Sequence, residues 1–199
     1  MESKEIEFNK LVAKVKICER CVRMCHRKKV LSNENGNINS KVIFIAEAPG
    51  RLGAEKTGKP LFGDKTGENF DYLLNSIGWR RENIFITNAI LCNPQKLNCS
   101  NSTPSDEETG NCSSYLKKTL ELVNPDIIVT LGKHALNALK LIQPHKFILK
   151  TCVAKKIPWN DKYLFPLYHM SPKAINFHRN MNKQKEDFIE LSKLVDSLN

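Results

Sequence analysis

Three polar residues with chemically useful side chains each stand at the end of a short apolar run: Glu47, Asn88 and His169. They offer a carboxylate, a carboxamide and an imidazole, which between them can accept a proton and both donate and accept hydrogen bonds. Each one alone has a structural explanation, as a helix cap, a turn residue or a hydrogen-bonded core residue. Gathered at one edge of a sheet, they would define a site, because convergent polar groups in a crevice mark a binding or active site.

The seven cysteines are a second group with chemical potential. An odd number of cysteines in a chain without a secretory signal favours metal-binding or catalytic thiols over a disulfide framework. Cys18 and Cys21 form a C-x-x-C knuckle, followed by Cys25 and a dense run of basic residues. Such a knuckle with two distant cysteines flanking a polar loop is what a tetrathiolate site needs, and the spacing suits either zinc or an iron–sulfur cluster.

Four apolar runs predict the strands that position the polar residues. Val42–Ala46 is too short for a free-standing helix and indicates a strand buried on both faces, which is typical of parallel sheets. Similar runs alternate with amphipathic segments along the chain, an order that predicts βαβ units. The expected strands are 42–46, 83–91, 126–131 and 163–168, and the expected helices are 4–17, 68–77, 103–123, 133–142 and 182–198.

We therefore predict an α/β fold, a three-layer α/β/α sandwich with a central four-stranded parallel sheet. Residues 1–199 are expected to form a single domain, in which residues 1–40 supply an N-terminal helix and the cysteine knuckle packed on the core. The carboxyl ends of parallel strands lie at one edge of the sheet, where open α/β sheets bind ligands. Glu47, Asn88 and His169 should meet there, beside the long glycine-rich loop 50–67.

Composition limits the classes of partner. The formal charge of +10 and the pI near 9.3 favour a polyanionic partner, and nucleic acid is the commonest polyanion. No apolar run approaches the roughly 20 residues that span a bilayer, and the start of the chain has no basic region leading into an apolar one. We expect an intracellular protein with no membrane partner.

The motifs along the chain resemble, in their order, those of the iron–sulfur uracil-DNA glycosylases, families four and five. The similarity runs from about Cys18 to the C-terminus, and several ordered motifs are far more specific than one. The first motif resembles family four, whereas Gly63-Asp64 and His169-x-Ser-x-x-x-x-Asn176 lean towards family five. The motifs are Ala46-Glu-Ala-Pro-Gly50, Thr57-Gly-Lys-Pro60, Gly63-Asp-x-x-Gly67, Ile86-Thr-Asn-Ala89, Cys92-Asn-Pro94, Pro104-Ser-x-x-Glu108 with Cys112, Leu131-Gly132 and His169-Met-Ser-Pro172.

The resemblance implies a [4Fe–4S] cluster and favours iron over zinc. The implied ligands are Cys18, Cys21, Cys92 and Cys112. Cys99 is the alternative to Cys112, and the remaining cysteines would be structural or exposed.

The resemblance also implies roles for the three polar residues. Asn88 would bond the Watson–Crick edge of an extruded uracil, and His169 would donate to the uracil O2 as negative charge builds on the leaving base. Glu47 or Asp64 would position the attacking water or stabilise the cationic sugar, Glu47 by the family-four pattern and Asp64 by the family-five pattern. The residues after Glu47 that would also bind substrate are Ala48, Pro49 and Gly50.

One departure from the family concerns the residue that stacks on the base. The family places a phenylalanine directly after the proline of Thr-Gly-x-Pro, but here Pro60 is followed by Leu61 and then Phe62. Either Phe62 shifts by one position to stack on the base, or stacking is weaker. Residues 172–179 would form a loop that wedges into the duplex, and the expected DNA contacts are Ser171, Lys173 and Arg179.

The leading hypothesis is a monofunctional uracil-DNA glycosylase of base-excision DNA repair, a monomer in the cytoplasm associated with the nucleoid. Its substrate would be DNA containing uracil or another deaminated base. The alternative is a non-catalytic iron–sulfur nucleic-acid-binding module, and a weaker third option is a redox protein. The base spectrum, the preference for single- or double-stranded DNA and protein partners stay open.

Overall fold

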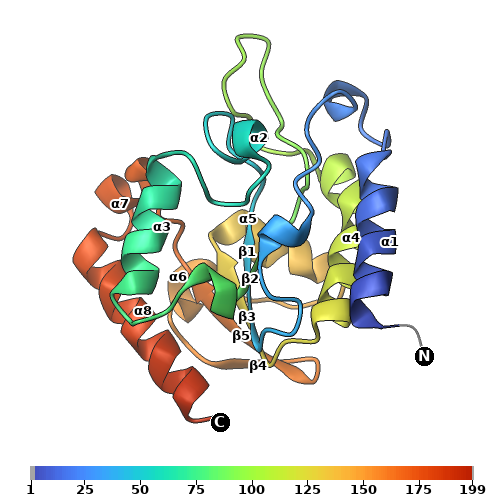
Figure 1. Cartoon of the computed structure of the whole chain (residues 1–199). Helices are drawn as coiled ribbons and strands as arrows, with labels where there is room; N and C mark the ends of the chain where they lie inside the picture. Colours follow the sequence, from blue (N-terminus) through green and yellow to red (C-terminus); the bar gives the residue numbers. More distant parts are fainter. Residues whose placement is uncertain (1–2, 199) are drawn as a thin grey trace.

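A computed structural model describes residues 3–198 and places one five-stranded sheet at the centre, in the order β2-β1-β3-β5-β4 (Figure 1). The strands β2, β1, β3 and β5 pair in parallel, and β4 pairs antiparallel with β5. The α/β fold is therefore confirmed. The strand bounds are β1 Val42–Ala46, β2 Phe85–Asn88, β3 Ile127–Leu131, β4 Ile157–Trp159 and β5 Lys162–Leu167.

The prediction of four parallel strands missed β4, so the sheet has five strands and is mixed. This strand has three residues and contains Pro158, which cannot donate to a ladder and is confined to sheet edges. A tight turn through Asn160, in the left-handed region at φ 50°, joins it to β5. A three-residue edge strand has too few residues to show an alternating pattern.

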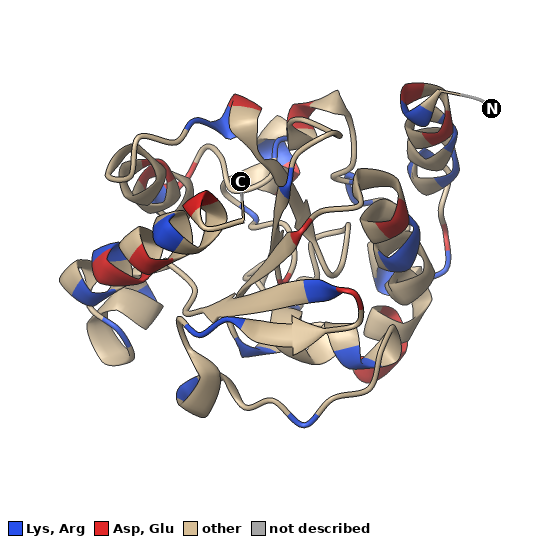
Figure 2. Cartoon of the chain, turned by 90° about the horizontal axis from the view of Figure 1, so that it is seen from below, with Lys and Arg blue, Asp and Glu red and all other residues tan. Residues whose placement is uncertain are grey.

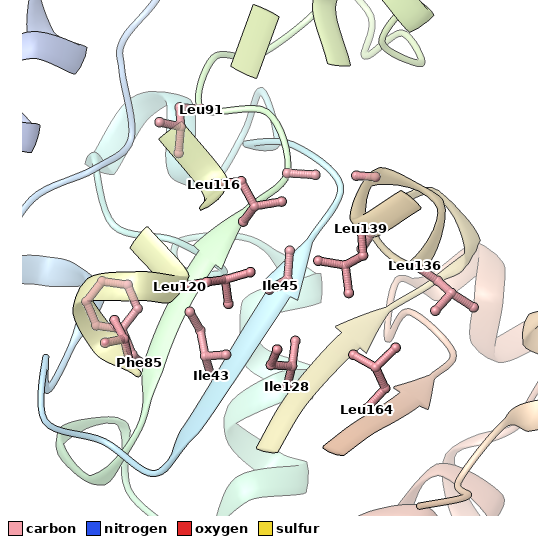
Figure 3. Packing of buried hydrophobic residues seen from close by; sticks show 14 of the residues in the cluster. Ile43, Ile45, Phe85, Leu91, Leu116, Leu120, Ile128, Leu136, Leu139 and Leu164 are labelled. Carbon is pink, nitrogen blue, oxygen red and sulfur yellow. The ribbon is translucent and has the colours of Figure 1, made fainter. Parts of the chain in front are cut away.

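Helices cover both faces of the sheet (Figure 1). On one face, the apolar side chains of α1, α4 and α5 pack on Ile43, Ile45 and Ile128 of the strands. Leu116 and Leu120 of α4 lie beside these strand residues (Figure 3). On the other face, α3 and α8 pack on the alternate residues of the same strands. The bounds of the helices are α1 Lys4–Lys16, α2 Ala54–Thr57, α3 Lys65–Asn75, α4 Asp106–Val123, α5 Lys133–Ala138, α6 Leu149–Cys152, α7 Pro172–Phe177 and α8 Met181–Asp196.

Two helix starts bear on the site. Ser105 accepts a hydrogen bond from the N–H of Glu108, whose carboxylate accepts one from the N–H of Ser105, so α4 begins with a capping box. Asp64 caps α3 through its own side chain alone, and its Oδ1 accepts a hydrogen bond from the N–H of Gly67 at 3.0 Å. Residues 172–177, expected to be loop, form the short helix α7, which Ser171 caps.

Charged side chains lie mainly on the outer helices and loops, whereas the central strands are almost free of them (Figure 2). None of the helices in the described part of the chain combines the length and apolar character needed to span a bilayer.

Candidate active site

A cleft of about 1050 Å³ opens at the carboxyl edge of the parallel strands. The register pairs Ala46 with Asn88, so the ends of β1 and β2 lie side by side, and β5 brings His169 to the same edge. Glu47, Asn88 and His169 all line this cleft, as the strand order implied. Other residues singled out from the sequence that line it are Ala48, Pro49, Gly50, Asp64, Ser171 and Lys173.

Asn88 presents an unpaired hydrogen-bond donor to the cleft. Its residue is 2% exposed, and its Nδ2 has no hydrogen-bond partner among the described residues. A buried polar atom without a partner costs about 1–3 kcal/mol. A ligand atom that accepts a hydrogen bond from this amide would remove that cost. The end of β2 therefore favours a ligand with a hydrogen-bond acceptor at this position.

His169 is held as a neutral imidazole with a fixed tautomer. The backbone N–H of Ser171 donates to Nδ1 at 3.2 Å, so the ring hydrogen resides on Nε2. Desolvation lowers the pKa of His169 to about 4, although the nearby negative charge of Asp64 opposes the change. At neutral pH the ring is therefore an uncharged hydrogen-bond donor through Nε2.

Two buried amides brace the backbone that carries His169. The Asn69 Nδ2 donates to the carbonyl oxygen of Met170 at 2.8 Å. The Gln184 Nε2 lies 3.4 Å from the carbonyl oxygen of His169 and 2.8 Å from that of Arg179, so one side chain joins both ends of the α7 segment. Sequence reasoning missed both residues, because an amide within an amphipathic helix carries no signal of its target.

The two candidate acids differ in their surroundings. Burial raises the pKa of Glu47, and the positive charges of His134 and Lys133 oppose that change. The Glu47 carboxylate receives no hydrogen bond from the described residues, whereas Asp64 is engaged as the cap of α3. The Asp64 Oδ2 also packs so closely on Gly53 that a Cβ there would lie 2.6 Å from it.

Leu61, rather than Phe62, faces the cleft. Leu61 is buried, adopts the left-handed region at φ 49° and lines the cleft. Phe62 is 42% exposed and does not line it. Its ring lies under the Lys59 ammonium, 5.0 Å from the centroid, and the Arg81 guanidinium, 5.6 Å from the centroid.

Arg81 fixes the segment that carries Leu61. Its guanidinium donates to the carbonyl oxygens of Pro60 at 3.0 Å and Leu61 at 2.5 Å, and its Nε donates to Asp71 at 2.6 Å. Gly67 lets α3 approach this segment, because a Cβ there would lie 2.5 Å from the Leu61 oxygen. Arg81 was not predicted from the sequence, because its partners are mainly backbone oxygens.

Arg179, expected to contact DNA, is turned inward. Its guanidinium forms two hydrogen bonds of 2.5 Å with the carboxylate of Asp187, which is 3% exposed. Arg179 does not line the cleft, whereas Ser171 and Lys173 do. The ion pair, with Gln184, fastens the end of the α7 segment to α8.

The four cysteines singled out as ligands surround one small cavity. Cys18, Cys21, Cys92 and Cys112 line it together with Cys25, whereas Cys99 lies outside it and is exposed. Burial is the main cause that raises the pKa of Cys92 to about 12 and that of Cys112 to about 11.

The type and number of these sulfurs fit a tetrathiolate centre. Within residues 3–198, no three His, Cys, Asp or Glu side chains are close enough to hold a metal ion.

Hydrogen bonds tie the cysteine loop to the cleft. Asn93, next to Cys92, donates from Nδ2 to the carbonyl oxygen of Pro49 at 2.6 Å and to Asn101 Oδ1 at 3.0 Å. The same Asn101 oxygen accepts from the backbone N–H of Arg51 at 3.0 Å. The loop after β1, which carries Glu47, and the loop after β2 therefore form one braced unit.

Comparison with known proteins places this architecture in a family. The family model described as "Uracil DNA glycosylase superfamily" matches residues 34–193. The chain is 33% identical over 159 residues to a type-4 uracil-DNA glycosylase of Thermotoga maritima, covering 79% of this chain and 78% of that protein.

Two further relatives belong to different types. A type-4 uracil-DNA glycosylase of Saccharolobus solfataricus is 33% identical over 190 residues, covering 92% of this chain and 84% of that protein. A type-5 uracil-DNA glycosylase of Pyrobaculum aerophilum is 28% identical over 158 residues, covering 72% and 67% respectively. With this cleft at the carboxyl edge of its sheet, the chain belongs to the uracil DNA glycosylase superfamily.

Proposed function

We propose that this protein is a DNA repair glycosylase that extrudes uracil from DNA and hydrolyses its N-glycosidic bond, leaving an abasic site. The observation that carries the proposal is the unpaired Nδ2 of Asn88 in the same cleft as the neutral His169. The names of the relatives, all uracil-DNA glycosylases, support the same substrate.

Recognition would begin with the base outside the stack, which costs a few kcal/mol. The Asn88 Nδ2 would donate to uracil O4, and its Oδ1 would accept from the N3–H. A carboxamide offers this donor and acceptor pair on one side chain. Since Nδ2 has no partner among the described residues, uracil gives it a hydrogen bond without breaking an existing one.

Bond cleavage would depend on His169. As the C1′–N1 bond breaks, its electron pair passes to the base and negative charge spreads to O2. The Nε2–H of a neutral imidazole would donate to that oxygen, which is stabilisation of developing charge by a preorganised donor. The hydrogen bond from Ser171 and the Gln184 and Asn69 braces hold the ring in place.

We assign Glu47 as the residue that positions the water attacking C1′. Its carboxylate is free to accept from water, whereas Asp64 is engaged at the start of α3. Its raised pKa makes it a stronger base than an exposed glutamate, and Lys133 and His134 favour its ionised form. Asp64 would hold Gly53 and the cap of α3, and Leu61 would pack against the base.

We also propose that Cys18, Cys21, Cys92 and Cys112 hold a [4Fe–4S] cluster. When bound, the cluster would tie the N-terminal segment to the loop after β2 and to α4. Anaerobically purified protein should be brown, with broad absorbance near roughly 400 nm and with iron and acid-labile sulfide. A colourless protein with stoichiometric zinc would refute this assignment.

The test of activity is alkali-induced strand cleavage of matched oligonucleotides carrying uracil, hypoxanthine or no lesion. The wild type should cut the uracil strand, and Asn88→Ala and His169→Ala should lose most of this activity while retaining DNA affinity. A wild type that binds DNA but cuts no lesion would favour the non-catalytic module. We expect a monomeric, nucleoid-associated protein, which sedimentation and cell fractionation would test.

A further inference from the structure

The cleft extends beyond the catalytic residues into an arm that takes no part in the proposed reaction, apart from the effect of Lys133 on Glu47. One wall is formed by Lys133 of α5 and by Lys140 of the 3-10 turn Leu139–Leu141 that follows it, and the other carries Phe147, Ile148 and Lys150. We call these five residues the lysine arm. We propose that the lysine arm binds the DNA strand beside the extruded nucleotide and favours an unpaired strand, an inference that rests on the proposed function.

The first argument is charge. From Ile127 to Asn160 the chain contains six lysines and no aspartate or glutamate. Lys133, Lys140 and Lys150 are exposed, and no ion pair involving them occurs among the described residues. Lysines without carboxylate partners along a groove attract phosphates, because binding them releases the counterions that condense on nucleic acid.

The second argument is spacing. Lys133, Asn137 and Lys140 stand at i, i+4 and i+7, which places them on one face of α5 and its continuation, and all three line the cleft. At about 1.5 Å per residue, Lys133 and Lys140 are separated by roughly 10 Å along the helix axis. One strand of B-DNA rises about 3.4 Å per nucleotide, so the two ammonium groups match phosphates about three nucleotides apart.

The third argument is the apolar wall. Ile148 is 65% exposed, and it is unusual for so large an aliphatic side chain in a basic groove to remain in contact with water. Phe147 is held beside it, with its ring stacked on His145 at 4.8 Å between centroids. His145 is itself fixed, by the carbonyl oxygen of Leu136 at Nε2 and the N–H of Phe147 at Nδ1.

Proteins hold single strands with a positively charged groove and aromatic side chains on which the bases stack. Phe147, with the apolar Ile148 beside it, provides such a surface between the lysines. The faces of paired bases are covered by their neighbours in a duplex, so Ile148 and Phe147 gain a partner only from unpaired bases. A single strand would therefore contact both walls of the arm, whereas a duplex would contact mainly the lysines.

The test uses a double variant, Lys140→Ala with Lys150→Ala, and a separate Ile148→Ser. Lys133 is left intact because its charge acts on Glu47. The matched control is Lys14→Ala with Lys117→Ala, which removes two exposed lysines of α1 and α4 that do not line the cleft. Single-turnover excision is measured on single- and double-stranded uracil oligonucleotides at several salt concentrations.

For the double variant we expect half-saturation on single strands to rise about tenfold, with the maximal rate unchanged and the log–log salt slope smaller by about 1.4, or 0.7 for each lost contact. Ile148→Ser should weaken single-strand binding about fivefold and leave duplex binding within about twofold. For Ile148→Ser, equal losses on single and double strands would overturn the proposal. For the double variant, losses no larger than those of the control would overturn it.

Anisotropy on uracil-free single strands separates this proposal from the proposed function. If the protein excises nothing but binds these strands through Lys140 and Lys150, the glycosylase activity is refuted and the lysine arm is supported. If the wild type excises uracil and both variants excise it and bind the strands as the wild type does, only the lysine arm is refuted.

Discussion

Protonation of His169 should make the folded state lose stability on mild acidification. The pKa of the ring is about 4 in the folded protein, against an ordinary value of 6.5. The unfolded chain therefore binds a proton between these values while the folded protein does not, so stability is full above pH 6.5 and falls as the pH drops towards 4. The difference, at about 1.4 kcal/mol per pKa unit, corresponds to at most about 3.5 kcal/mol.

The assay is urea unfolding at intervals from pH 7 to pH 4.5, for the wild type and for His169→Asn. Carboxylates elsewhere also titrate in this range, so the informative quantity is the difference between the two proteins. The free energy of unfolding of the wild type should fall by about 2 kcal/mol more than that of the variant by pH 4.5. Water in the cleft screens the ring and reduces the effect below its maximum.

Parallel stability curves for the two proteins would refute the reasoning, because they would mean that the ring titrates alike in the folded and unfolded states. Proton NMR of the imidazole gives an independent check, and the ring should stay uncharged down to about pH 5. A ring that becomes protonated near pH 6.5 would remove the basis for treating His169 as a neutral donor.

Three further predictions concern residues outside the cleft, two that hold Leu61 and one at the start of α4. Arg81→Met should lower the free energy of unfolding by about 2–4 kcal/mol in urea titrations, because Asp71 and the Leu61 carbonyl lose their donors, and should raise KM more than it lowers kcat. Gly67→Ala should destabilise the protein by more than about 1 kcal/mol in the same assay and weaken binding of uracil, since its Cβ would displace Leu61. The Arg23 guanidinium holds the pKa of Glu108 below its usual range, so the stability that this carboxylate contributes is present at neutral pH and is lost as the pH falls through that lowered pKa. Glu108→Gln should lack this acid-dependent loss of stability in thermal melts between pH 5 and pH 3.

The sequence was most informative where burial on both faces left no ambiguity. The apolar run Val42–Ala46 predicted β1 at its observed bounds, and the strand order brought Glu47, Asn88 and His169 to one cleft. Contacts to backbone oxygens were beyond reach, because they leave no pattern in residue types. The Arg81 clamp on Leu61 is of this kind.

Charge alone also led to an expectation that the structure does not support. Arg179 was expected to contact DNA because it lies in a basic segment. Asp187, 8 residues further along the chain, binds it instead. An acid at that distance can be exposed or buried, and only the packing of α8 makes it a partner. The family resemblance left two outcomes open at the base-stacking position, a shifted Phe62 or weaker stacking. In the structure Leu61, with its left-handed backbone, lines the cleft and Phe62 does not.

The two outer edges of the sheet have a consequence for contacts between copies of this protein. At β2, Asn37 donates to the Ile84 carbonyl oxygen and Asn35 to that of Ile86, so the segment 33–37 occupies the edge groups. At the opposite edge, β4 is short and interrupted by Pro158. Neither edge offers a row of free donors and acceptors to a second chain. A second copy of the chain therefore finds no open sheet edge, which prevents the strand addition that leads to aggregation.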